Sequence, residues 1–128
     1  MAVVIGFIPD EYGEAALTAG LEEAQRRRTG VVVVNSTRGD SLIDKRYLGS
    51  SGRTLLDERL AASGVDHEVR QTMGRDVAEE IPAVAGEIHA DAIVIGIRHR
   101  TPVGKLIMGS VAQRVIIDAA CPVVAVKP

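Results

Sequence analysis

The stretch from Ala92 to Ser110 reads AIVIGIRHRTPVGKLIMGS and is the most informative part of this chain. Its first four residues are apolar and mostly β-branched, which is typical of a buried strand. Gly96 ends that run, and Gly109 precedes Ser110 and an apolar, helix-like segment at 111–120. A strand, a loop and a helix start in this order can bind phosphate, because the first N–H groups of a helix have no partner within it. The stretch therefore predicts a strand–loop–helix unit with a possible anion site.

Three further apolar runs resemble this strand, at residues 3–5, 31–34 and 123–126. In each run the apolar residues occupy consecutive positions instead of alternating with polar ones. Strands with this pattern are buried on both faces, which requires helices on both sides of a largely parallel sheet. We therefore expect an α/β fold with three layers.

Between these strands, apolar residues recur at spacings of three and four, which predicts amphipathic helices at 14–28, 53–63 and 76–89. We expect Gly30 to end the first helix, because glycine accepts a left-handed backbone. Asp76 is expected to cap the third helix, with Glu79 completing a capping box. Pro82 should kink that helix, because a proline in mid-helix costs roughly 3 kcal/mol.

The segment from Val65 to Gln71 alternates apolar and charged residues, which is typical of a half-exposed edge strand. The elements then follow the order β-α-β-α-β-α-β-α-β, and the 128 residues fit one domain, 1–128. Ligands of such doubly wound sheets bind beyond the carboxyl ends of the strands, where the strand order reverses. The long, charged connection from Ser36 to Ser50 suits either a lid or an interaction surface.

The composition argues against several classes of protein. The formal net charge is −2, and the chain has one Phe, two Tyr and no Trp, so we expect no nucleic-acid partner. Cys121 is the only cysteine, which excludes an internal disulfide and favours a packing role. The chain has no apolar run of the roughly 18 residues that a membrane helix needs, and no basic segment precedes its first apolar run. We therefore expect no membrane partner and a cytoplasmic location.

The loop from Gly96 to Ser110 supports two interpretations. In the first, Gly96 and Gly109 let the backbone approach a phosphate, Ser110 caps the following helix, and Arg98 and Arg100 add positive charge. In the second, the glycine and serine mark only a helix start, and the arginines are solvated.

Two common nucleotide motifs are excluded. A Walker A loop fails because Gly104 and Lys105 are followed by Leu106, and because His99 stands where its first glycine belongs. The dinucleotide fingerprint is absent, since the first strand leads into GFIPDEYGEA. No carboxylate lies within 96–110 to hold a metal or orient a water, so we expect no catalytic residues, no metal site, and at most slow ATP hydrolysis.

The chain resembles the universal stress proteins, which carry a G-x2-G-x9-G-[ST] loop after the fourth strand of a small α/β domain. Gly96 and Gly109-Ser110 stand at the matching distance, and VAQRVIIDAACPVVAVK follows at 111–127. EAAL at 14–17 resembles the first helix of that family. The resemblance implies a doubly wound, five-stranded parallel sheet of order 3-2-1-4-5. It also implies a homodimer and, in some members, an adenine-nucleotide cofactor such as ATP, ADP or AMP.

By the same resemblance, the phosphates would lie at the loop after the fourth strand, at Gly96, Arg98, His99, Arg100, Gly109, Ser110 and Val111. The adenine and ribose would lie near the ends of the first two strands, at Gly6, Ile8, Val34 and Asn35. The sequence departs from the family pattern at both ends of this site. His99 replaces the second glycine of the loop, and Ile8 stands where nucleotide-binding members usually have aspartate, with Asp10 two residues further on. Both departures predict weak or altered nucleotide binding.

Three functions stay open at this point: a stress-response regulator that binds an adenine nucleotide, a relative that has lost the nucleotide and acts through an unidentified protein partner, and a slow ATP hydrolase. The loop favours the first, whereas Ile8 and His99 favour the second.

The last strand either lies under helices in a monomer or pairs with the last strand of a second copy, and the family resemblance favours a homodimer interface at Val123, Val124, Ala125 and Val126. The other edge strand is protected by its charges, whereas this one is apolar up to Lys127. Pro122 and Pro128 lack N–H donors and would confine pairing to the residues between them. Val124 is a candidate donor across the interface.

Overall fold

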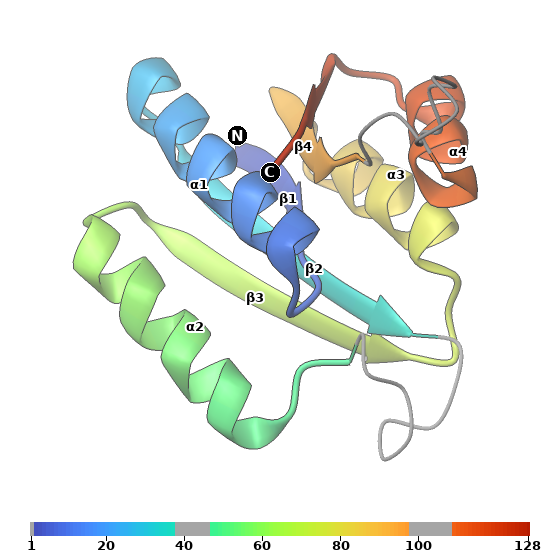
Figure 1. The fold of residues 1–128 in the computed structure, drawn as a ribbon. Coiled ribbons are helices and arrows are strands. Elements are labelled where there is room, and N and C mark those ends of the chain that lie inside the picture. Colours follow the sequence, from blue (N-terminus) through green and yellow to red (C-terminus); the bar gives the residue numbers. More distant parts are fainter. Residues whose placement is uncertain (1, 38–46, 98–108) are drawn as a thin grey trace.

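The sheet has the strand order that the sequence predicts. The computed structural model describes residues 2–37, 47–97 and 109–128, and its five parallel strands follow the order β3-β2-β1-β4-β5 (Figure 1). Their bounds are β1 Ala2–Gly6, β2 Gly30–Thr37, β3 His67–Met73, β4 Ala92–Gly96 and β5 Val123–Val126. The edge strand predicted at 65–71 lies in β3, shifted by two residues at each end.

Helices cover both faces of the sheet, so the expected three-layer α/β fold is confirmed. Their bounds are α1 Glu11–Arg27, α2 Ser50–Ser63, α3 Val77–Glu87 and α4 Ser110–Asp118. Buried side chains of α1 and α2 join one hydrophobic cluster, and those of α3 and α4 join another. Figure 1 shows these two pairs of helices on opposite sides of the strands.

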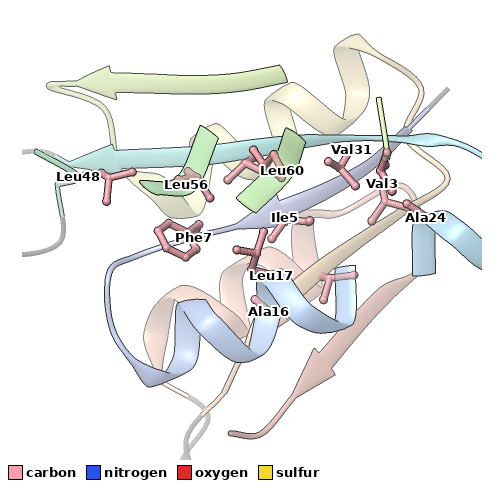
Figure 2. Close-up of a cluster of buried hydrophobic side chains, with 13 residues drawn as sticks. Val3, Ile5, Phe7, Ala16, Leu17, Ala24, Val31, Leu48, Leu56 and Leu60 are labelled. Atoms are coloured by element: carbon pink, nitrogen blue, oxygen red, sulfur yellow. The ribbon is translucent and has the colours of Figure 1, made fainter. Parts of the chain in front are cut away.

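Consecutive residues of β1 explain why its apolar run is unbroken. Val3 and Ile5 belong to the cluster under α1 and α2, whereas Val4 belongs to the cluster under α3 and α4, and all three are fully buried. Figure 2 shows Ile5 of β1 beside Leu17 of α1, with Leu60 of α2 in the same cluster. Each strand side chain therefore meets a helix layer whichever way it points.

The first helix ends differently from the prediction at Gly30. Arg28 takes the left-handed conformation instead, with φ 54°, and its N–H donates to carbonyl groups in the last turn. Gly30 begins β2 and pairs with Ala2. A Cβ on Gly30 would lie 2.8 Å from the carbonyl oxygen of Asp66, so this glycine serves a close approach of backbones rather than a helix end. The prediction was wrong because spacing alone does not reveal that neighbour.

The third helix begins as predicted. Asp76 is its N-cap, and its Oδ1 accepts a hydrogen bond from the N–H of Ala78 at 3.1 Å. Pro82 lies inside α3, which continues to Glu87, so the packing of its apolar face outweighs the loss of one helical hydrogen bond. Within the described ranges, no helix has both the length and the apolar character needed to cross a bilayer.

Candidate functional site

A cleft lies where the strand order reverses, between β1 and β4. From β1 the chain crosses through α1 to β2, and from β3 it crosses through α3 to β4, on the other side of β1. The connections on the two sides of β1 run over opposite faces, which leaves a gap beyond the carboxyl ends of the strands, at Gly6 and Gly96. This edge of the sheet is the expected ligand position for the fold.

Two adjoining hollows form the cleft. The strand hollow has a volume of about 410 Å³ and is lined by Gly6, Phe7, Ile8, Asp10, Tyr12, Gly13, Val77, Ile81, Ile95, Gly96, Gly109, Ser110, Val111 and Ala112. The helix hollow has a volume of about 310 Å³ and is lined by Ser36, Thr37, Asp76, Val77, Ala78, Ser110, Val111 and Arg114. They share Val77, Ser110 and Val111, so the first turns of α3 and α4 lie between them.

The turn from β1 to α1 packs tightly against the end of β4. A Cβ on Gly96 would lie 2.3 Å from the carbonyl oxygen of Tyr12, and a Cβ on Gly13 would lie 1.8 Å from that of Ile8. Both oxygens belong to the backbone, so they cannot move aside as the end of a flexible side chain could. The wall of the strand hollow therefore requires glycine at both positions, whatever the cleft binds.

The start of α4 opens into the cleft. Gly109, rather than Ser110, is the N-cap of α4, with φ 83° and ψ 151°. The expectation that Ser110 caps this helix was wrong, because the chain enters α4 through a conformation that glycine alone adopts readily. A Cβ on Gly109 would meet no atom of the described residues within 4 Å. The first N–H groups of α4 and the positive end of its dipole favour an anion there.

Arg114 is a cation in the wall of the helix hollow. Its guanidinium donates to Oδ2 of Asp76 at 2.7 Å and to Oε1 of Glu79 at 3.3 Å, which links α4 to α3. The hydrogen bond to Asp76, followed by that to Glu79, raises the pKa of Arg114 above its ordinary value. The cleft thus holds a permanent cation and a capping carboxylate side by side.

A model of the universal stress protein family matches residues 1–127. The chain belongs to the universal stress protein family. It is 46% identical over 126 residues to a universal stress protein of Mycolicibacterium smegmatis, covering 98% of this chain and 97% of the relative. Membership places the chain among the stress-response proteins of this family.

Solved structures of universal stress proteins share the fold. One from Archaeoglobus fulgidus has a TM-score of 0.80 and 32% identity, covering 98% of this chain and 97% of that one. Another structure from the same organism, a complex with dAMP, has a TM-score of 0.74 and 29% identity, covering 98% of this chain and 96% of that one.

Several of the expected nucleotide residues line the cleft. Gly96, Gly109, Ser110 and Val111 all lie on the strand hollow, and so do Gly6 and Ile8. Arg98, His99 and Arg100 lie outside the described residues. The structure thus brings the end of β1, the end of β4 and the start of α4 together around one space.

Val34 and Asn35 are not among the cleft-lining residues. Val34 is fully buried and pairs with Gly6 in the sheet. The side chain of Asn35 is also fully buried; its Nδ2 donates to the carbonyl of Phe7 at 2.9 Å, and its Oδ1 accepts from the N–H of Leu48 at 2.8 Å. Asn35 therefore links the end of β1 to the segment that precedes α2. Through its hydrogen bond to Phe7, it helps to position a residue that lines the strand hollow.

The side chain of Asp10 makes a hydrogen bond within the protein. Its Oδ1 accepts from the N–H of Gly13 at 2.9 Å, so it caps α1. Asp10 lines the strand hollow, but its Oδ1 is already engaged in capping α1. It is therefore not equivalent to the aspartate that nucleotide-binding members of the family usually have at the position of Ile8. The β1 end of the cleft is thus walled by the apolar Ile8 rather than by a free carboxylate.

Sequence reasoning missed most of the helix hollow. Ser36 and Thr37 end β2, Asp76 starts α3, and Arg114 lies one turn into α4. Two signals point to this grouping: parallel strands end at the same edge of a sheet, and Ser110 and Arg114 are four residues apart on one helix face. Among the described residues, no group of three or more His, Cys, Asp or Glu side chains is arranged to hold a metal ion.

Cys121 is half-buried at the margin of the cluster under α3 and α4. Burial, with a smaller contribution from Asp91, raises the pKa of its thiol above the ordinary value. A raised pKa disfavours the reactive thiolate, which agrees with a packing role.

Proposed function

We propose that this universal stress protein binds an adenine nucleotide weakly in the cleft, and that occupancy regulates its part in the stress response. The observation that carries the proposal is the start of α4 at the switch point of the sheet, where Gly109 is the N-cap, no described side chain caps the first turn, and Ser110 and Val111 line both hollows. The dAMP complex of the Archaeoglobus fulgidus relative, 29% identical to this chain, supports the choice of ligand class.

The phosphate would lie against the N–H groups of Ser110 and Val111, as anions do at helix starts. The base would lie in the strand hollow, whose walls include Phe7, Ile8 and Ile81. These apolar side chains offer contact with the faces of a purine, but Ile8 offers no hydrogen-bond acceptor to the ribose. We therefore expect affinity in the micromolar to millimolar range rather than tight binding.

Native mass spectrometry of gently purified protein, followed by calorimetric titration with ATP, ADP and AMP, tests this function. Co-purified nucleotide, or saturable heat with an adenine nucleotide, supports it. A protein that carries no nucleotide and gives no heat at millimolar ATP would be the alternative kind of relative, which acts through a protein partner. Ile8 is the observation that favours this alternative.

A homodimer through β5 forms the second part of the proposal. β5 pairs with β4 on one side and lies at the end of the sheet order. Val123, Val124 and Val126 are only half-buried, so an antiparallel β5 from a second copy would cover apolar surface as well as extend the sheet. Light scattering at micromolar concentration tests it: a mass near twice 13.6 kDa is expected, and 13.6 kDa itself would exclude the dimer.

The register between β4 and β5 determines which N–H groups of β5 point away from β4 and could donate hydrogen bonds to a second copy. The N–H of Ile93 donates to the carbonyl of Pro122, and that of Ile97 donates to Val126. In a parallel ladder these bonds turn the backbone groups of Val124 toward β4. The expectation that Val124 donates to the partner was therefore wrong, and Val123 and Ala125 present the outward N–H groups.

A further inference from the structure

Arg114 is held in a position that a bound phosphate can compete for. Its side chain is 42% exposed, and its acidic partners are Asp76, the N-cap of α3, and Glu79 in the first turn of α3. The pair with Glu79 is exposed on both sides and its N–O distance is 3.3 Å, so solvent and salt weaken it and it exchanges readily for a better partner, whereas Asp76 is only 14% exposed and holds Arg114 more firmly. A phosphate dianion is a better partner, because it carries two negative charges and offers the planar guanidinium two acceptor oxygens.

The helix geometry directs this side chain toward the proposed phosphate position. Ser110 and Arg114 are four residues apart, so they lie on the same face of α4, and both line the helix hollow. Side chains on a helix lean toward its N-terminus. The backbone of Arg114 therefore lies one turn beyond the start of α4, and its side chain is long enough to reach back to that start.

We propose that Arg114 exchanges its ion pair with Glu79 for the outer phosphates of the ligand while it stays beside Asp76, and thereby selects di- and triphosphates over monophosphates. This inference rests on the proposed nucleotide site. The N–H groups at the start of α4 suffice for one phosphate group, whereas Arg114 extends the anion site along the helix hollow. Exchange also removes one of the two ion pairs between α3 and α4, so occupancy would loosen the contact between these two helices.

Calorimetric titration of four proteins tests the role of Arg114: the parent, Arg114→Gln, Glu79→Gln and the double variant. We expect Arg114→Gln to weaken ATP binding about tenfold and AMP binding by less than about threefold. Glu79→Gln should strengthen ATP binding about threefold, because it frees Arg114 from one competitor. That gain should vanish in the double variant, since it acts through Arg114.

A purely structural role makes a different prediction. Arg114→Gln and Glu79→Gln both remove part of the same bridge between α4 and α3, so a structural role requires both to weaken binding or neither to change it. Either result would overturn the proposal, as would equal losses for ATP and AMP. Arg59→Gln is the matched control, because Arg59 pairs with Glu14 at similar exposure but lies on α2, outside the cleft-lining residues. It should leave both affinities unchanged.

Inorganic tripolyphosphate, titrated into the same four proteins, separates the two hypotheses. If ATP does not bind but tripolyphosphate binds in an Arg114-dependent way, the nucleotide function is wrong and the role of Arg114 stands. If ATP binds and Arg114→Gln changes nothing, the role of Arg114 is wrong and the nucleotide function stands. If neither ligand binds the parent protein, both are wrong.

Discussion

Gly96 and Tyr12 approach so closely that a single methyl group on the glycine would lie 2.3 Å from the tyrosine's carbonyl oxygen. Gly96 ends β4 and Tyr12 lies in the first turn of α1, so the contact joins two segments more than eighty residues apart. It sets the distance between the helix and the sheet at the wall of the strand hollow. Gly96, the first glycine of the nucleotide-loop motif, is thus required for the packing of α1 against β4, whether or not a ligand binds.

Gly96→Ala should therefore destabilise the protein even without nucleotide. We expect a loss of about 1–3 kcal/mol in the free energy of unfolding, as for other insertions into well-packed sites. Urea denaturation followed by circular dichroism measures it. The matched control is Gly86→Ala, because a Cβ at Gly86 in α3 meets no described atom outside its own helix within 4 Å, and alanine favours the helix. A Gly96→Ala protein as stable as its parent would contradict the role assigned to this contact.

Gly109→Ala should weaken nucleotide binding about tenfold. Alanine at φ 83° and ψ 151° is strained by about 1–3 kcal/mol, so the entry to α4 would shift and move the N–H groups of Ser110 and Val111. Calorimetry with ATP measures the change. Gly64→Ala provides the comparison, because Gly64 also has a positive φ of 73° and open space around it, but it caps α2 away from the cleft. Equal losses of affinity in both variants would show that strain, not geometry at α4, is responsible.

Restoring the family pattern should strengthen binding. We expect Ile8→Asp and His99→Gly together to lower the dissociation constant for ATP, because the aspartate supplies a ribose acceptor in the strand hollow and the glycine restores the loop. The comparison of the double variant with the parent is made by calorimetry. Ile8→Asn carries the same shape without the charge and should give a smaller gain. Unchanged or weaker binding by a folded double variant would mean that these two positions do not face the nucleotide.

The β5 dimer predicts that proline disrupts dimerisation at one edge of the sheet and not at the other. Ala125→Pro removes an outward N–H from β5 and should shift the protein to monomer in light scattering. Val69→Pro does the same on β3, where the register with β2 turns the backbone of Val69 outward, and it should leave the dimer intact. Circular dichroism must show that both variants fold. A dimer that survives Ala125→Pro would exclude pairing through β5.

The fold followed from sequence because its signals are local. An unbroken apolar run such as 31–34 indicates a strand that is buried on both faces. A helical spacing such as that at 76–89 indicates a helix that is buried on one face, and neither inference requires knowing which distant segment packs there. The strand order came from the resemblance carried by Gly96, Gly109 and Ser110. The same motif also identified the strand hollow, since its residues lie in the segments that flank one loop.

The helix hollow and the reasons behind individual glycines depend on contacts between distant segments. Asp76 and Arg114 are 38 residues apart in sequence, yet they meet because parallel strands bring every helix start to one edge of the sheet. Gly30 leaves room for the backbone of Asp66, and Gly96 leaves room for the backbone of Tyr12. No rule of residue spacing identifies either neighbour. Periodicity specifies which face of an element is buried, whereas the neighbour on that face is set only when the layers pack.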